Sequence, residues 1–72
     1  MARDVEIRGD MIRLGQLLKL ADVVDAGGEV KDFLAEVPVL VNGEPDQRRG
    51  RQLHPGDFVV CGDEELRVVS AS

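Results

Sequence analysis

The chain has 72 residues, of which 43% are hydrophobic and 32% charged, and it carries a formal net charge of −5. This length fits one domain, residues 1–72, and the composition excludes a disordered tail. No apolar run approaches the roughly 18 residues of a membrane span, and the first ten residues lack the apolar segment of a signal peptide, so we expect a cytoplasmic protein without a membrane partner.

A strand and then a helix are predicted at the start of the chain. Val5 and Ile7 alternate with polar residues, a pattern typical of a short half-buried strand that ends at Gly9. Between residues 13 and 22 the period changes, and the apolar residues at i, i+3, i+4 and i+7 are Leu14, Leu17, Leu18 and Ala21. This spacing predicts an amphipathic helix, and Asp10 lies just upstream, where an aspartate can help a helix to begin.

The same spacing returns in the next segment and predicts a second amphipathic helix from about Gly27 to Glu36. Its apolar residues are Val30, Phe33, Leu34 and Val37. Asp25 is a candidate N-cap, and Pro38 prevents the helix from continuing.

Turn signals divide the rest of the chain into short strands. Asn42-Gly43 predicts a two-residue hairpin turn because both residues tolerate positive φ. A turn at residues 54–57 leads into a strand at Phe58–Cys61, and a turn at Gly62–Glu65 precedes a final strand at Leu66–Val69. We therefore predict an α+β fold in which two short helices pack on one side of a small antiparallel β-sheet.

Few residues in the sequence carry reactive chemistry. Cys61 is the sole cysteine and lies in an apolar run, which is typical of a buried hydrophobic residue, and His54 is the sole histidine. These residues give no metal site, and the sequence has no nucleophile with a base beside it, so we expect neither catalysis, nor a cofactor, nor a small-molecule substrate. The only aromatic residues, Phe33 and Phe58, are expected to pack in the core.

Basic residues are concentrated in the stretch QRRGRQLHPGD, where Arg48, Arg49 and Arg51 surround a glycine. A short basic loop is commonly a solvated one, but it also suits the binding of phosphates. Gly27-Gly28, at the predicted start of the second helix, would leave backbone N–H groups open to an anion, or would only permit a tight turn. Other basic residues that could border the same surface are Arg13, Lys19 and Lys31.

The order of these motifs between residues 12 and 60 resembles the S-four-type RNA-binding domain, named after small-subunit ribosomal protein four, and in particular its short stand-alone bacterial members. Arg13-Leu14 matches the common opening of the first helix, and Lys31 matches a basic residue early in the second. Val41-Asn42-Gly43 matches the family's hairpin, and Pro55-Gly56-Asp57 its closing turn. The resemblance implies that the two helices form the RNA-facing alpha-L motif against a sheet. It also implies that five residues bind the RNA backbone: Arg13, Lys31, Arg48, Arg49 and Arg51.

These observations lead to two hypotheses about function. The first is a non-catalytic protein that binds structured RNA through phosphate and shape contacts, since exposed aromatic residues for base stacking are not expected. The RNA would be ribosomal or tRNA-like, and the partner could be a ribosome or a ribosomal precursor. Its candidate site comprises Arg13, Lys19, Gly27, Gly28, Lys31, Arg48, Arg49 and Arg51. The alternative is a protein-interaction module that uses the acidic flank of the second helix, formed by Glu29, Asp32 and Glu36.

Overall fold

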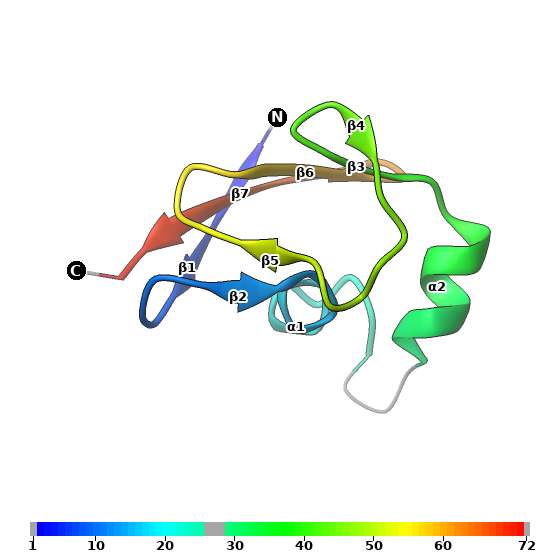
Figure 1. Cartoon of the computed structure of the whole chain (residues 1–72), viewed down its shortest axis with the longest axis horizontal. Coiled ribbons are helices and arrows are strands. Elements are labelled where there is room, and N and C mark those ends of the chain that lie inside the picture. Colours follow the sequence, from blue (N-terminus) through cyan, green and yellow to red (C-terminus); the bar gives the residue numbers. More distant parts are fainter. Residues whose placement is uncertain (1, 26–28, 72) are drawn as a thin grey trace.

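The structure, a computed structural model, describes residues 2–25 and 29–71 and has the predicted α+β fold (Figure 1). A five-stranded sheet has the strand order β1-β7-β6-β3-β4, and a second sheet consists of β2 and β5. The strands of the large sheet are β1 Arg3–Ile7, β3 Val39–Val41, β4 Glu44–Pro45, β6 Phe58–Cys61 and β7 Glu64–Ser70. The other elements are β2 Ile12–Arg13, β5 Gln52–Leu53, α1 Leu14–Leu20 and α2 Val30–Glu36.

The large sheet is mixed, whereas the sequence predicted an antiparallel one. β3, β4, β6 and β7 pair antiparallel with their neighbours, but β1 lies parallel to β7, with Val5 opposite Val68. The two parallel strands lie at opposite ends of the sequence. The alternation that identified β1 gives its buried face but not the direction of the distant strand beside it, so the parallel pair was not foreseen.

The small sheet places the arginine-rich loop beside the first helix. β2 and β5 pair antiparallel, with Ile12 opposite Leu53, and each has two residues, too few for a periodicity to be read. The pairing continues into the helix, because Leu14 N donates to Arg51 O at 2.8 Å and Gly15 N donates to Arg49 O at 2.9 Å. The loop carbonyls thus accept two N–H groups that the first turn of a helix otherwise leaves without a partner.

Both helices are present, and the first begins at Leu14, within the predicted range, but neither is capped by the residue that the sequence suggested. Arg13, not Asp10, is the N-cap of α1, since the β2 strand occupies the residues just before the helix. α2 begins at Val30 with Glu29 as its N-cap, so Asp25 does not cap it. Gly27 and Gly28 lie outside the described residues. The end of α2 agrees with the prediction, since Val37 is extended (φ −110°, ψ 123°), as a residue before proline prefers.

One hydrophobic core lies between the large sheet and the helices. In α1, Leu14, Leu17 and Leu18 are 0% exposed, and Val30 and Leu34 of α2 belong to the same cluster. Strands of the large sheet contribute by alternation, and their buried residues are Val5, Ile7, Val39, Val41, Val59, Cys61, Leu66 and Val68. Leu53 of β5 is buried in the same core.

The predictions for the cysteine and the two aromatic residues have different outcomes. Cys61 is a buried free thiol, as predicted, and burial raises its pKa. Phe33 packs half-buried against the core. The core prediction for Phe58 was wrong. In β6 the buried residues are Val59 and Cys61, so Phe58 alternates onto the opposite face, where it is half-buried.

The two turn motifs of the sequence are joined in space. Asn42 and Gly43 have φ of 52° and 84°, as the predicted hairpin requires. Asn42 Nδ2 donates to Asp57 Oδ1 at 3.1 Å, and Asn42 Oδ1 accepts from Phe58 N at 3.0 Å. The hairpin is therefore fastened to the turn before β6. The last hairpin is tighter than predicted, because β7 begins at Glu64 rather than at Leu66.

Candidate nucleic-acid interface

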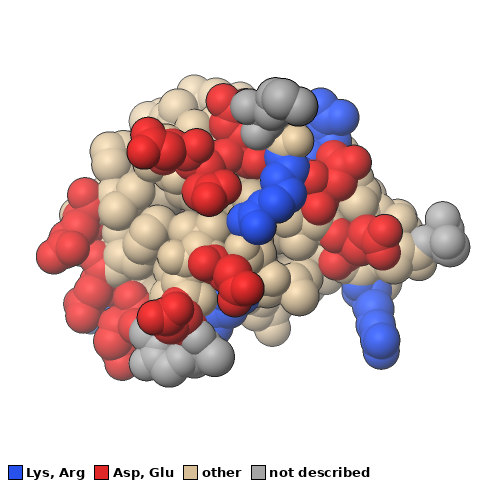
Figure 2. Space-filling view, turned by 180° about the vertical axis from the view of Figure 1, so that it is seen from behind, with Lys and Arg blue, Asp and Glu red and all other residues tan. Residues whose placement is uncertain are grey.

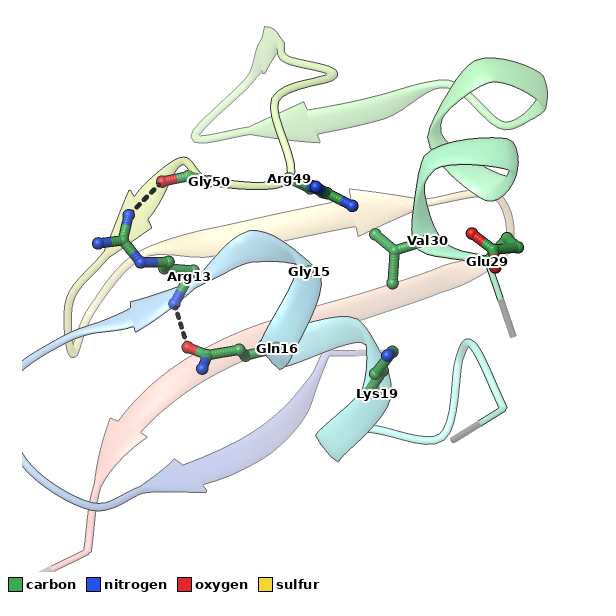
Figure 3. A pocket seen from close by; sticks show the side chains of 8 residues that line it. All are labelled: Arg13, Gly15, Gln16, Lys19, Glu29, Val30, Arg49 and Gly50. Carbon is green, nitrogen blue, oxygen red and sulfur yellow. Dashed lines mark hydrogen bonds between the residues drawn. The ribbon is translucent and has the colours of Figure 1, made fainter. Parts of the chain in front are cut away.

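An open pocket of about 370 Å³ lies where α1, the start of α2 and the arginine-rich loop meet (Figure 3). Its lining residues are Arg13, Gly15, Gln16, Lys19, Glu29, Val30, Arg49 and Gly50. Three of the predicted basic residues thus come together, Arg13 from the N-cap of α1, Lys19 from α1 itself and Arg49 from the loop. Arg13, Lys19 and Arg49 are all exposed.

The start of α1 fixes Arg13 at one side of the pocket. Its guanidinium Nη1 donates to the carbonyl of Gly50 at 3.1 Å, and its backbone N–H donates to Gln16 Oε1 at 3.2 Å (Figure 3). Gln16, the third residue of the helix, thus accepts the backbone N–H of the N-cap residue, as the third residue of a capping box does. Arg13 ties the loop to the helix while its side chain stays exposed to solvent.

Gly15 allows the loop to lie directly on α1. A Cβ atom at this position would be 3.3 Å from Val30 Cγ1 and 3.4 Å from both the Cβ and the carbonyl oxygen of Arg49. The absence of a side chain therefore lets α1, α2 and the loop approach one another closely. In the resulting arrangement Arg49 projects from the loop toward α2, with Lys19 on α1 below it (Figure 3).

The buried carboxylate of Asp46 holds the base of the loop. Its side chain is 5% exposed, and its Oδ1 accepts from Arg48 N at 2.8 Å. The carboxylate also binds both Nε and Nη2 of Arg48, at 3.2 and 2.9 Å, and Nη1 of Arg51 at 2.7 Å. The hydrogen bond from the Arg48 side chain, helped by its backbone N–H and by Arg51, holds the pKa of Asp46 well below its usual range, although burial opposes this.

The ion pairs with Asp46 distinguish two of the three loop arginines from the third. Arg48 and Arg51 are each ion-paired with a carboxylate, and the same pairing raises the pKa of Arg48. Within residues 2–25 and 29–71, the guanidinium of Arg49 forms no hydrogen bond or ion pair. Of the trio, Arg49 is thus the residue whose charge is uncompensated.

The remaining predicted residues are distributed around the pocket rather than in it. Arg48 and Arg51 line a separate open pocket of about 490 Å³ on the other side of Gly50, with His54. Lys31 is exposed on α2 and does not line the pocket of Arg49. The predicted contacts at Gly27 and Gly28 fall on residues that the structure does not describe.

From the sequence, Glu29 was assigned only to the acidic flank of the second helix and Asp46 was not considered, but both lie at the site. Glu29 lines the pocket at the N-cap of α2, where its charge opposes that of the three cations. Asp46 was missed although a signal existed: an aspartate whose carboxylate binds the N–H two residues on is the common Asx turn, and Asp46 precedes Arg48 by two.

The chemistry available at this site is electrostatic. Three cations against one carboxylate give the pocket a local positive charge, in contrast to the net charge of the whole chain. Among the described residues there is no group of three or more His, Cys, Asp or Glu placed to hold a metal ion. The same part of the chain has no helix long and apolar enough to cross a membrane.

Comparison with known proteins agrees with the motifs and the fold. The family model for the S4 domain matches residues 5–69. The probable ribosome maturation protein RlbA of Bacillus subtilis (strain 168) is 59% identical over 59 residues, which cover 82% of this chain and 83% of that protein. The chain belongs to the S4 domain family.

Proposed function

We propose that this domain binds structured RNA through the pocket between α1 and the arginine-rich loop. The observation that carries the proposal is the convergence of Arg13, Lys19 and Arg49 on one open pocket, in a chain that is otherwise acidic. Guanidinium groups bind phosphate oxygens in pairs, and Lys19 adds a point charge beside them. The pocket therefore suits the phosphodiester backbone.

The aromatic residues favour a folded RNA over an extended single strand. Both are half-buried, Phe33 against the core and Phe58 on the far sheet face, so neither lines the cationic pocket. Proteins that bind single strands normally stack the bases on exposed aromatic side chains. Without such a platform, recognition rests on phosphate positions and on the shape of the RNA.

The related Bacillus protein suggests which RNA is bound. Its name describes it as a probable ribosome maturation protein. We infer that the present chain acts on ribosomal RNA or on a ribosomal precursor in the cytoplasm, and that it acts by binding and not by catalysis. This inference is consistent with a site made of cations rather than of reactive groups.

The number of cations limits the strength of binding. Three phosphate contacts give a slope of log affinity against log salt of about −2 to −3, at roughly −0.7 to −0.9 for each contact. Glu29 at the edge of the pocket and the overall charge of −5 weaken the attraction further. We therefore expect an affinity that falls markedly in moderate salt.

The test compares three single substitutions in retention of a folded ribosomal RNA fragment across a salt series. Arg49→Ala removes the uncompensated guanidinium and should reduce the slope by about 0.7–0.9. Arg48→Ala removes a guanidinium paired with Asp46 and should change the slope less. Arg67→Ala, on an exposed position of β7 in the large sheet, changes the net charge equally and serves as the matched control.

The comparison distinguishes RNA binding at the pocket from electrostatic attraction of RNA to the protein as a whole. If Arg67→Ala lowers retention as much as Arg49→Ala does, RNA responds only to net charge and the pocket is not its site. Simultaneous replacement of all three loop arginines is a poorer test, since it also removes both partners of Asp46 and with them the support of the loop.

A further inference from the structure

We propose that the outer face of the five-stranded sheet is a second interaction surface, which docks a basic protein segment that carries apolar side chains. This outer face consists of the strand side chains that alternate with the core residues. Its apolar members include Pro45, Val69 and the three residues on which the proposal rests, Leu40, Phe58 and Val60, and its acidic members are Asp4, Glu6 and Glu65.

Strand register places the three apolar residues in one continuous patch. Leu40 of β3 lies opposite Val60 of β6, and Phe58 lies two residues along the same strand. All three are half-buried, whereas their neighbours Val39 and Val59 are 2% and 0% exposed. The patch is therefore an apolar surface that is only partly shielded from solvent.

The helices do not cover this patch. The buried residues of α1 and α2, such as Leu17 and Leu34, belong to the same core cluster as Val59 on the other side of the sheet. The small sheet also lies on the side of α1, since its ladder continues into that helix. Among the described elements, the outer face thus has no layer packed on it (Figure 1).

The charge of the outer face indicates the chemistry of its partner. In the register Glu65 lies opposite Val60 and Arg67 lies opposite Phe58, while Asp4 and Glu6 lie one strand farther from the patch, on β1. The described strands thus give the outer face three carboxylates and one cation, Arg67. Figure 2, which views the molecule from behind, shows acidic side chains distributed around uncharged surface, with few basic ones. This sign is opposite to that of the pocket formed by Arg13, Lys19 and Arg49.

This charge distribution selects one occupant. Phosphates would be repelled by the carboxylates, and a second copy of the chain would place like charges against each other. A basic protein segment with apolar side chains satisfies both features, because its cations meet Asp4 and Glu6 on β1 while its apolar groups cover Leu40, Phe58 and Val60. The domain would then hold RNA on one side and a basic protein on the other.

The experiment is a nuclear magnetic resonance titration of the isotope-labelled full chain with a synthetic peptide in which lysine alternates with leucine and threonine. We expect amide shifts concentrated in β6 and β7. The double reversal Asp4→Lys with Glu6→Lys should weaken binding about tenfold. The matched control, Asp32→Lys with Glu36→Lys, makes the same change of charge on exposed positions of α2 and should leave the affinity within about twofold.

Two further measurements test the apolar contribution. Val60→Thr keeps the strand preference and the size of the side chain but should weaken peptide binding several-fold, while an unchanged melting temperature shows that the fold persists. A peptide of lysine alone should bind more weakly than the mixed peptide. The proposal is overturned if the lysine peptide binds equally well, if both double reversals weaken binding equally, or if the α2 reversal alone does so, which would place docking on the acidic flank of α2.

Discussion

Replacing Asp46 by asparagine should destabilise the domain and change its response to acid. The carboxylate accepts hydrogen bonds from Arg48 N, from Nε and Nη2 of Arg48, and from Nη1 of Arg51, at 2.7–3.2 Å. Asparagine keeps the size of the side chain and one acceptor oxygen. It loses the negative charge, and its amide group would face the guanidinium groups.

The expected loss is smaller than that for a fully buried ion pair. Removing one partner of such a pair costs about 3–5 kcal/mol, but exposed pairs contribute only about 0–1 kcal/mol. The Asp46 side chain is 5% exposed, whereas those of Arg48 and Arg51 are 73% and 30% exposed and remain hydrated after the change. We therefore expect a loss of about 1–2 kcal/mol at neutral pH, mostly from the charge-assisted bonds to Arg51 and to the backbone N–H of Arg48.

A domain of this length has a free energy of unfolding of about 4–11 kcal/mol, so such a loss is measurable, at roughly 4–8 °C in melting temperature for each kcal/mol. Because the folded-state pKa of Asp46 lies below its usual value of 3.8, its stabilisation is complete well above pH 4 and is lost as the pH falls through the folded-state pKa. Urea unfolding of both proteins at neutral and acidic pH should thus show a difference in unfolding free energy that is constant at neutral pH and narrows in acid.

Asp63→Asn, in the exposed turn between β6 and β7, is the control for the loss of one negative charge. It should have little effect on the unfolding free energy. If Asp46→Asn lowers the unfolding free energy no more than Asp63→Asn does, or if its effect is the same at neutral and at strongly acidic pH, the carboxylate does not support the loop.

Four further substitutions test the packing of the site and the fold. Gly15→Val should cost about 1–3 kcal/mol of stability, measured by thermal melting, and should weaken RNA retention because Arg49 must move away from α1; a variant that binds RNA as tightly as the wild type would contradict the role of this close approach. Gly43→Ala forces a side chain to adopt a φ of +84° and should cost about 1–2 kcal/mol, while Gly50→Ala, which meets no atom nearer than 3.9 Å, should be nearly neutral in the same urea titration. Leu17→Ala removes a fully buried side chain and should cost about 2–5 kcal/mol, so that retention of the wild-type unfolding midpoint would be inconsistent with the described core.

Local patterns in the sequence were sufficient for the fold class and for most strands. The strand at Phe58–Cys61 has the predicted bounds, and Asn42-Gly43 forms the predicted hairpin, because period-two alternation and positive φ are properties of a few adjacent residues. The parallel pairing of β1 with β7 joins the two ends of the sequence, so it could not be predicted from patterns of adjacent residues. The two-residue strands β2 and β5 were not predicted either, because two residues are too few to show an alternation.

The candidate site was predicted in part. Arg13, Lys19 and Arg49 do line one pocket, whereas Lys31 lies outside it. Counting charges along the loop could not separate Arg49 from its neighbours, because the difference depends on which guanidinium groups the buried Asp46 reaches. The partner of each arginine is decided by folding and not by the number of basic residues in the stretch.

The ladder between the arginine-rich loop and α1 restricts how this part of the chain can evolve. The carbonyls of Arg49 and Arg51 must face the N–H groups of two consecutive residues, Gly15 and Leu14. An insertion or deletion of one residue between β5 and Arg49 would shift this alignment, leave helix N–H groups without acceptors and turn Arg49 away from the pocket. Homologues that bind different RNAs are thus expected to vary the side chains of this loop while its length stays fixed.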